Sequence, residues 1–284
     1  MQTNPDGCTP QAGFNGQAVT ISPARRFASR RWTRGEMHEG AENIAEETAV
    51  ALTYNGISHA VMMATPQDLE DFALGFSLTE GILLQPDELL DCEERPGPNG
   101  IEIALTIPNR RFAELRVRRR NLVGRTGCGL CGVDSLEQAL RPLRAVQNEV
   151  VITAPAIGRA LTALPTRQAM NRQVHAIHAA AWSLPDGTVA DIREDVGRHN
   201  ALDKLLGAMA REGIDAECGF VMVTSRCSYE IVQKAVARNI GILVAVSAPT
   251  ALALRLAEAA GLTLIARADR EHWTLYTHPR RIAA

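Results

Sequence analysis

The sequence is short of cysteine for its length and has no long apolar run. Its 284 residues contain six cysteines, and only one pair of them is closely spaced. A secreted scaffold held by disulfides would be shorter and denser in cysteine. No apolar stretch approaches the length that spans a bilayer, and the N-terminus lacks the basic and apolar segments of a signal peptide. We therefore expect a protein of the reducing cytoplasm that does not bind membranes.

The chain also has little net charge. The formal value is -2 at pH 7, which excludes bulk electrostatic attraction to nucleic acid or to a membrane surface as the main mode of binding. We find no internal repeat and no low-complexity tract. Hydrophobic residues make up 46%, which indicates a globular chain with one large domain or two modest ones.

The residue patterns predict three segments. Residues 1–44 are rich in Gly, Pro, Asn and Gln before they turn basic, and we expect a flexible extension. Residues 45–145 predict a smaller α+β region that ends in a Cys-x-x-Cys loop. Its expected elements are a strand at 48–54 closed by the turn Asn55-Gly56, a helix opening at Thr65-Pro66, and a hairpin of strands near 101–107 and 115–117.

Residues 146–284 predict a cofactor-binding domain of the α/β class. Strands are expected near 220–224, 242–246, 262–266 and 273–277, with helices that begin near 199, 229 and 249. Strands and helices that alternate at this spacing are typical of a layered α/β sheet.

The strongest chemical signal is the loop from Gly124 to Gly132, which contains Cys128 and Cys131. A thiolate is the reactive form of cysteine, and nearby positive charge lowers the pKa of a thiol. The stretch from Arg110 to Arg125 holds seven arginines and one acid. Four glycines in the loop leave its backbone free to move and let a bulky partner approach. A basic, mobile, thiol-bearing loop suits delivery of sulfur as a persulfide.

Other interpretations of this thiol pair remain open. A structural zinc site needs four ligands, and no second Cys-x-x-Cys or His-x-x-x-His follows, so a dimer would have to supply the rest. A thioredoxin-like redox pair normally opens a helix and contains little glycine. A zinc deaminase needs His-x-Glu upstream of Pro-Cys-x-x-Cys, and here Gly127 precedes Cys128 and no such His-x-Glu occurs.

Two polar loops downstream are candidate ligand sites. The first contains Gly197, Arg198, His199 and Asn200 just before an expected helix, where backbone N–H groups favour anions. The second contains Ser225 and Arg226 after an expected strand, at the sheet edge where ligands bind in open α/β folds. A capped helix with a solvated face explains the first loop about equally well. We interpret Cys227 as a buried small residue.

Two histidines, His175 and His178, have the spacing of helical metal ligands. No carboxylate or third ligand lies near them in the sequence, so we interpret them as ordinary polar residues and expect no bound metal. The segment from Arg267 to His272 lies between two expected strands, and alone it indicates a charged hairpin turn.

Several motifs together resemble those of the formate dehydrogenase accessory sulfurtransferase family, commonly called FdhD. They cover the chain from about residue 45 to its end. The matching segments are Asn55-Gly56, Met63-Ala-Thr-Pro66, Gly75-Phe76, Glu80-Gly81, Gly127-Cys-Gly-Leu-Cys-Gly132, Glu194-Asp-Val-Gly-Arg-His-Asn200, Asp203-Lys204, Ser225-Arg226, Ser228, Glu230, Ser247-Ala-Pro-Thr250 and Tyr276-Thr-His-Pro279.

The resemblance implies a sulfur carrier with a fold similar to cytidine deaminases and a homodimeric state. A cysteine desulfurase would load a persulfide on Cys128, and Cys131 would assist or resolve it. The sulfur would pass to the bis-molybdopterin guanine dinucleotide molybdenum cofactor before that cofactor enters formate dehydrogenase. The family's cofactor segment corresponds here to Arg267, Ala268, Asp269, Arg270, Glu271 and His272. The alternative hypothesis is a chaperone that binds this cofactor without transferring sulfur.

Overall fold

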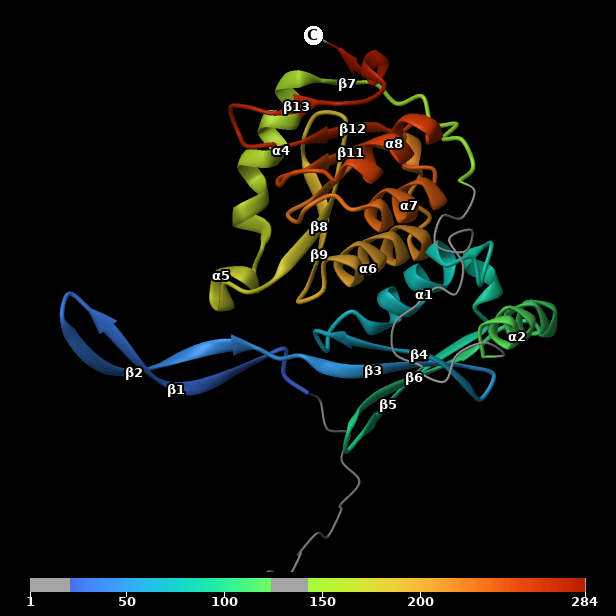
Figure 1. The fold of residues 1–284 in the computed structure, drawn as a ribbon, viewed down its shortest axis with the longest axis horizontal. Coiled ribbons are helices and arrows are strands. Elements are labelled where there is room, and N and C mark those ends of the chain that lie inside the picture. The colour runs from blue at the N-terminus through green and yellow to red at the C-terminus, as the bar shows by residue number, and fades with distance from the viewer. Residues whose placement is uncertain (1–20, 124–142, 284) are drawn as a thin grey trace, which may run out of the picture.

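The main body is built around a six-stranded mixed sheet (Figure 1). The computed structural model describes residues 21–123 and 143–283. The strand order is β13 (Thr274–Leu275), β12 (Thr263–Ala266), β11 (Ile242–Ala245), β10 (Phe220–Val223), β8 (His178–Ser183) and β9 (Val189–Asp195). The central strands β10, β11 and β12 are parallel and fully buried, and the outer pairings are antiparallel. The expected α/β class is therefore confirmed for this half of the chain.

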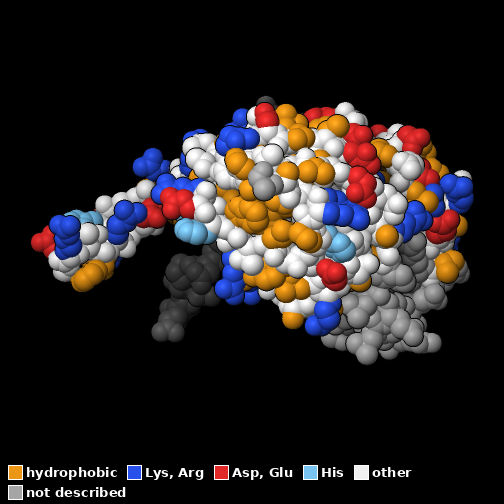
Figure 2. All heavy atoms as spheres, turned by 90° about the horizontal axis from the view of Figure 1, so that it is seen from above, with side chains coloured by type: hydrophobic (Ala, Val, Ile, Leu, Met, Phe, Trp, Pro, Cys, Tyr) orange, Lys and Arg blue, Asp and Glu red, His pale blue; other side chains and the backbone are white. Residues whose placement is uncertain are grey.

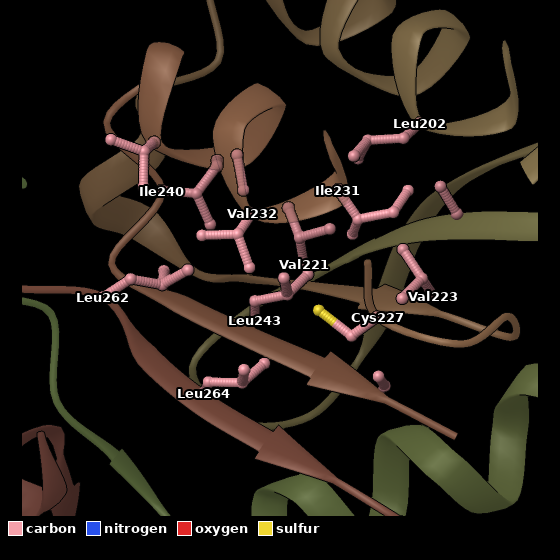
Figure 3. Close-up of a cluster of buried hydrophobic side chains, with 14 of the residues drawn as sticks. Leu202, Val221, Val223, Cys227, Ile231, Val232, Ile240, Leu243, Leu262 and Leu264 are labelled. Carbon is pink, nitrogen blue, oxygen red and sulfur yellow. The ribbon is translucent and has the colours of Figure 1, made fainter. Parts of the chain in front are cut away.

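Helices cover both faces of this sheet. On one face lies α4 (Ala154–Arg167), whose Ile157, Ala160 and Leu164 pack against the strands. The other face carries α6 (Arg198–Arg211), α7 (Tyr229–Ala237) and α8 (Ala251–Ala260). Figure 3 shows the hydrophobic core on this face, in which side chains of α6 and α7 contact those of the parallel strands. The short helix α5 (Asn171–Val174) leads into β8, and β7 (Ile152–Thr153) pairs with β14 (Ile282–Ala283).

The N-terminal half forms a second, smaller sheet. Its order is β4 (Ile57–Ala64), β3 (Thr48–Tyr54), β6 (Gly100–Thr106) and β5 (Asp91–Gly97), and the helices of this half are α1 (Leu69–Thr79) and α2 (Asn109–Val123). Alternate residues of β3 and β6 point into one apolar core with α1, as their sequence alternation predicts. Single 3-10 turns occur at Pro86–Glu88, Ala216–Cys218 and Pro279–Arg281.

The two halves meet where α1 crosses α6. The crossing is tight because a glycine stands on each helix at the contact. A Cβ built on Gly75 would come within 3.0 Å of the backbone of Asp203, and one built on Gly207 would come as close to the backbone of Asp71. Only glycine allows backbones to approach this closely. This contact explains why Gly75 is required, although it lies in a helix.

Two expectations for the N-terminal half are wrong. The predicted strand near 115–117 is part of α2: Phe112 and Leu115 lie one helical turn apart and pack against the core, while Val117 is exposed. Two alternating positions were too few to outweigh the helix-favouring Arg, Ala, Glu and Leu around them. We expected residues 1–44 to form a flexible extension, but β1 (Ala24–Thr33) and β2 (Glu36–Ala45) form a regular hairpin.

The remaining elements follow the prediction more closely. The turn Asn55-Gly56 closes the hairpin of β3 and β4, with both residues at positive φ. The helix expected from Thr65-Pro66 begins at Leu69. In the described part of the chain, no helix combines the length and the apolar composition that crossing a bilayer requires.

Candidate functional site

A pocket of about 1060 Å³ opens beside the carboxyl ends of the parallel strands. One wall is the apolar side of α4, including Leu161, Leu164 and Pro165. The other lining residues come from the loop between β12 and β13, from the region around α5 and from the start of β8. Ligands of open α/β folds bind at this edge of a sheet, and the size fits an organic ligand as large as a nucleotide.

The loop between β12 and β13 is the predicted cofactor segment. Ala268, Asp269, Arg270, Glu271 and His272 all line the pocket. Arg267 does not; it lies exposed at positive φ and its backbone N–H donates to Ser247 O at 3.1 Å.

Asp269 holds this loop in shape. Its carboxylate accepts the backbone N–H groups of Glu271 at 2.8 Å and His272 at 2.7 Å. These hydrogen bonds, first the one from Glu271, keep the pKa of Asp269 below its ordinary value. The carboxylate is therefore ionised near neutral pH, and the loop presents a fixed negative group next to Arg270.

His175 and His178 also line the pocket, so they are part of the candidate site. They are not on one helix: His175 ends α5 with φ 52°, and His178 is the first residue of β8. Burial lowers the pKa of His178, and the positive charge of Arg198 adds to this effect. His178 is thus neutral near pH 7 and can accept or donate one hydrogen bond.

The loop from Gly197 to Asn200, at the start of α6, makes contacts that mainly hold the fold together. Asn200 is buried and donates its Nδ2 to Met63 O at 2.8 Å and to Asp195 at 3.0 Å. Glu194 accepts the backbone N–H groups of Met170 and Asn171 at 2.8 Å each and so fixes the start of α5 at the pocket rim. None of Gly197, Arg198, His199 and Asn200 lines the pocket.

Two buried ion pairs continue this network between the halves of the chain. Lys204 Nζ lies 2.7 Å from Asp195, and both side chains are fully buried. Thr65 is held by the same pair: its N–H donates to Asp195 at 3.0 Å and its carbonyl accepts from Lys204 at 3.0 Å. Lys234 Nζ lies 2.9 Å from Asp203, the residue before Lys204. Asp203 also accepts the hydroxyl of Thr79 in α1 at 2.7 Å. The motif residues Asp195, Asp203 and Lys204 therefore join α6 to the N-terminal half.

Arg198 keeps a group that a ligand can use, whereas His199 links this loop to the next one. Arg198 Nε is buried and has no hydrogen-bond partner among the described residues. His199 Nε2 lies 2.9 Å from Glu230 and 3.4 Å from the Ser228 hydroxyl, which links the two predicted loops. The hydrogen bond from His199 lowers the pKa of Glu230.

The second predicted loop, which spans Thr224 to Glu230, reaches the pocket through its first residue, Thr224, rather than through the predicted contacts Ser225 and Arg226. Thr224 lines the pocket and accepts the N–H of Ala179 at 2.9 Å. Its neighbour Ser225 is buried, with its hydroxyl donating to Arg226 O at 3.0 Å, and Arg226 is exposed; neither lines the pocket.

The predicted catalytic cysteines, Cys128 and Cys131, lie outside the described residues. Of the cysteines that are described, Cys227 has no exposed surface and belongs to the core cluster in Figure 3. Burial raises its pKa to about 12, so its interpretation as a buried small residue is confirmed. Within residues 21–123 and 143–283, no group of three or more His, Cys, Asp or Glu side chains is arranged to hold a metal ion.

Comparison with known proteins agrees with this arrangement. The sequence model of the FdhD/NarQ family matches residues 45–283. The chain is 52% identical over 256 residues to Sulfur carrier protein FdhD of Cupriavidus necator, a match that covers 90% of this chain and 89% of that one. It is 49% identical to the protein of the same name from Variovorax paradoxus, covering 84% and 86%.

The fold is also similar to a solved structure. The crystal structure of a candidate formate dehydrogenase accessory protein from Desulfotalea psychrophila superposes with a TM-score of 0.70 at 25% identity, covering 92% of this chain and 99% of that one. Family match, identity and fold point in the same direction, and the chain belongs to the FdhD/NarQ family.

Proposed function

We propose that this chain is a sulfurtransferase that carries persulfide sulfur to the bis-molybdopterin guanine dinucleotide molybdenum cofactor for formate dehydrogenase. A cysteine desulfurase is the proposed donor. Relatives with about half of their residues identical are named sulfur carriers, and this likeness over most of the chain carries the proposal. The pocket beside Ala268–His272 supports it, because a carrier needs a place to hold the acceptor of its sulfur.

Cys128 is the proposed carrier and Cys131 the proposed resolving thiol. The Cys128 thiolate attacks the outer sulfur of the desulfurase persulfide, and the desulfurase cysteine leaves as a thiolate. When Cys131 then attacks the inner sulfur of Cys128, a Cys128–Cys131 disulfide forms and the outer sulfur leaves as hydrosulfide for the cofactor. A cellular thiol must afterwards reduce the disulfide. Every step transfers one electron pair, so no other oxidant is needed.

The cofactor is a substrate here, and we propose that one of its guanine nucleotide arms occupies the pocket. The apolar surface of α4 suits a purine ring, and the ionised Asp269 suits the N–H groups of a guanine edge. Arg270 adds a cation beside them for a phosphate. Arg198, with its unpartnered Nε, is the proposed contact of the α6 loop, and Arg226 that of the neighbouring loop.

We also propose the cytidine-deaminase layering, a homodimer and a cytoplasmic setting. Helices on both faces of a mixed sheet support the first. The family resemblance supports the second, and a reactive thiol pair that must stay reduced supports the third. Superposition on a cytidine deaminase should align the parallel strands β10–β12 with α4 on one face and α6–α8 on the other.

The proposal is tested by mass spectrometry after incubation with a desulfurase and cysteine. The wild type should gain one sulfur atom on Cys128, and Cys227→Ala should gain it equally because Cys227 is buried in the core. Cys128→Ala should gain none at this position or elsewhere. If the wild type gains no sulfur, or if Cys128→Ala gains as much, the sulfur-carrier proposal fails.

A further inference from the structure

The hairpin of β1 and β2 is an arm that projects from the body (Figures 1 and 2). The strands pair residue for residue from Ala24↔Ala45 to Thr33↔Glu36. At its base, Ala24 and Ala45 pack against a small cluster that includes Val174 of α5. Beyond the base its large apolar side chains, Phe27, Ile44, Met37 and Trp32, are 45% to 67% exposed. An isolated ribbon of two strands is marginally stable in water and gains stability from further strands or from packing against a helix, which here reaches only the base of the arm.

Three of the five arginines of the arm have an acidic partner within the chain. On β1, Arg25 pairs with Glu46 at 2.6 Å, Arg30 with Glu39 at 3.2 Å, and Arg31 with Glu42 at 2.6 Å. Arg26, the fourth arginine of β1, and Arg34, in the turn of the hairpin, have no acidic partner among the described residues. Strand β1 therefore carries one uncompensated cation, Arg26, and two exposed aromatic rings, Phe27 and Trp32.

The other strand is a poorer edge for association. β2 contains Glu36, Glu39, Glu42 and Gly40, which belong to residue types that are depleted in strands. Its base also contacts α5. By contrast, β1 contains Phe27, Trp32 and Thr33, which favour strands, and it pairs only with β2 among the described strands. The free backbone edge of β1 is the one suited to pairing.

We propose that this edge pairs antiparallel with β1 of a second copy of the chain, with Ser29 opposite Ser29 at the two-fold axis. In this register Arg26 faces Trp32 of the partner subunit, and Phe27 faces Arg31 of the partner subunit. Each aromatic ring thus meets a guanidinium, which is a favourable cation–π pair. No arginine stands directly opposite another, and the two ribbons become one four-stranded antiparallel sheet.

This arrangement rests on the homodimer proposed above and adds a consequence for the pocket. Because the strands are antiparallel, Thr33 of the partner subunit lies opposite Arg25, close to the base of the arm. That base packs on α5, whose first residue, Asn171, lines the pocket. The tip of each arm therefore lies near the pocket of the other subunit, and the two cofactor sites share one assembly.

Paired cysteine variants of the full-length chain test the interface. Ser29 and Gly40 are neighbours across the hairpin, so Ser29→Cys and Gly40→Cys probe its two edges at the same height. Cysteine is accommodated at Gly40, where a Cβ would have only the Ser29 hydroxyl near it, at 3.7 Å. After mild oxidation with copper phenanthroline, linked peptides are identified by mass spectrometry and compared with those of the wild type. Ser29→Cys should form the 29–29 disulfide, and Gly40→Cys should form no 40–40 disulfide. A 40–40 link, or no link in either variant, overturns the proposal.

A charge exchange gives a second readout that does not depend on cross-linking. Arg26→Glu removes two cation–π contacts per dimer and should raise the dimer dissociation constant roughly tenfold in analytical ultracentrifugation. Adding Trp32→Lys restores an attractive pair across the interface and should recover the dimer. An unchanged dissociation constant for Arg26→Glu, or no recovery in the double variant, contradicts the register. Sulfur loading of Cys128 is measured separately, so failure of this interface leaves the sulfur-carrier proposal intact.

Discussion

Replacing Lys204 by Met should destabilise the protein strongly without changing the pocket. Lys204 Nζ and the Asp195 carboxylate are 2.7 Å apart and fully buried. Breaking a buried pair on one side costs about 3–5 kcal/mol, because the remaining charge is left without its partner. Asp195 keeps three donors, the N–H groups of Thr65 and Gly197 and the side chain of Asn200. We therefore expect a loss at the lower end, about 3 kcal/mol of unfolding free energy.

The assay is a urea titration followed by fluorescence. Arg280→Ala is the matched control, since Arg280 pairs with Glu149 at the surface with both side chains more than half exposed; it should cost less than about 1 kcal/mol. Asp195→Asn combined with Lys204→Met should cost less than the sum of the single changes, because no lone charge remains. Binding of GDP to folded protein should be unchanged, since Lys204 does not line the pocket. A loss below about 1 kcal/mol for Lys204→Met would refute the structural role of this pair.

Three further outcomes follow from the structure. Gly75→Ala should lower the unfolding free energy by about 2 kcal/mol or more, because the new Cβ meets the backbone of α6. The control Gly40→Ala should have a small effect. Equal melting temperatures for the two variants would contradict the tight crossing of α1 and α6. His199 lowers the pKa of Glu230 in the folded state, so the stability that this carboxylate contributes is present above its unfolded pKa of about 4.3 and is lost as the pH falls through the lower folded value. In urea titrations, the difference in unfolding free energy between the wild type and Glu230→Gln should therefore shrink in acid. A difference that grows in acid would oppose this. Iodoacetamide at pH 8 should modify the exposed Cys218 but not Cys227, whose buried thiol has a pKa of about 12. The labelled cysteines are identified by peptide mass spectrometry. Fast labelling of Cys227 would show that the core around it opens.

The sequence predicted the central strands β10, β11 and β12 well because they are short, almost entirely apolar and separated by helices of clear period. Val221, Leu243 and Leu264 lie on neighbouring strands of one buried core. The arm was missed for the opposite reason. Its residues make almost no buried contacts beyond Ala24 and Ala45, so neither strand has the apolar alternation that marks a half-buried strand.

The polar motif around α6 shows a different limit. Its density of charge predicted a ligand loop, yet Asn200 and Lys204 contact Met63 and Thr65, which lie well over a hundred residues earlier in the chain. Spacing within a motif cannot reveal partners that only the fold brings together. The pocket was found in part: the loop from Ala268 to His272 was predicted, but the wall supplied by α4 was not, because its leucines match any core helix.

The central claim is that sulfur moves through Cys128 to the cofactor, and a single-turnover transfer tests it most directly. The protein is loaded with labelled sulfur by a desulfurase, freed of excess cysteine, and mixed with the molybdenum cofactor and cofactor-free formate dehydrogenase. The account predicts that the label leaves Cys128, appears on the cofactor and accompanies the gain of formate dehydrogenase activity. Equal activation by the unloaded protein, or by a Cys128→Ala, Cys131→Ala double variant, would contradict it and favour a chaperone that binds the cofactor without transferring sulfur.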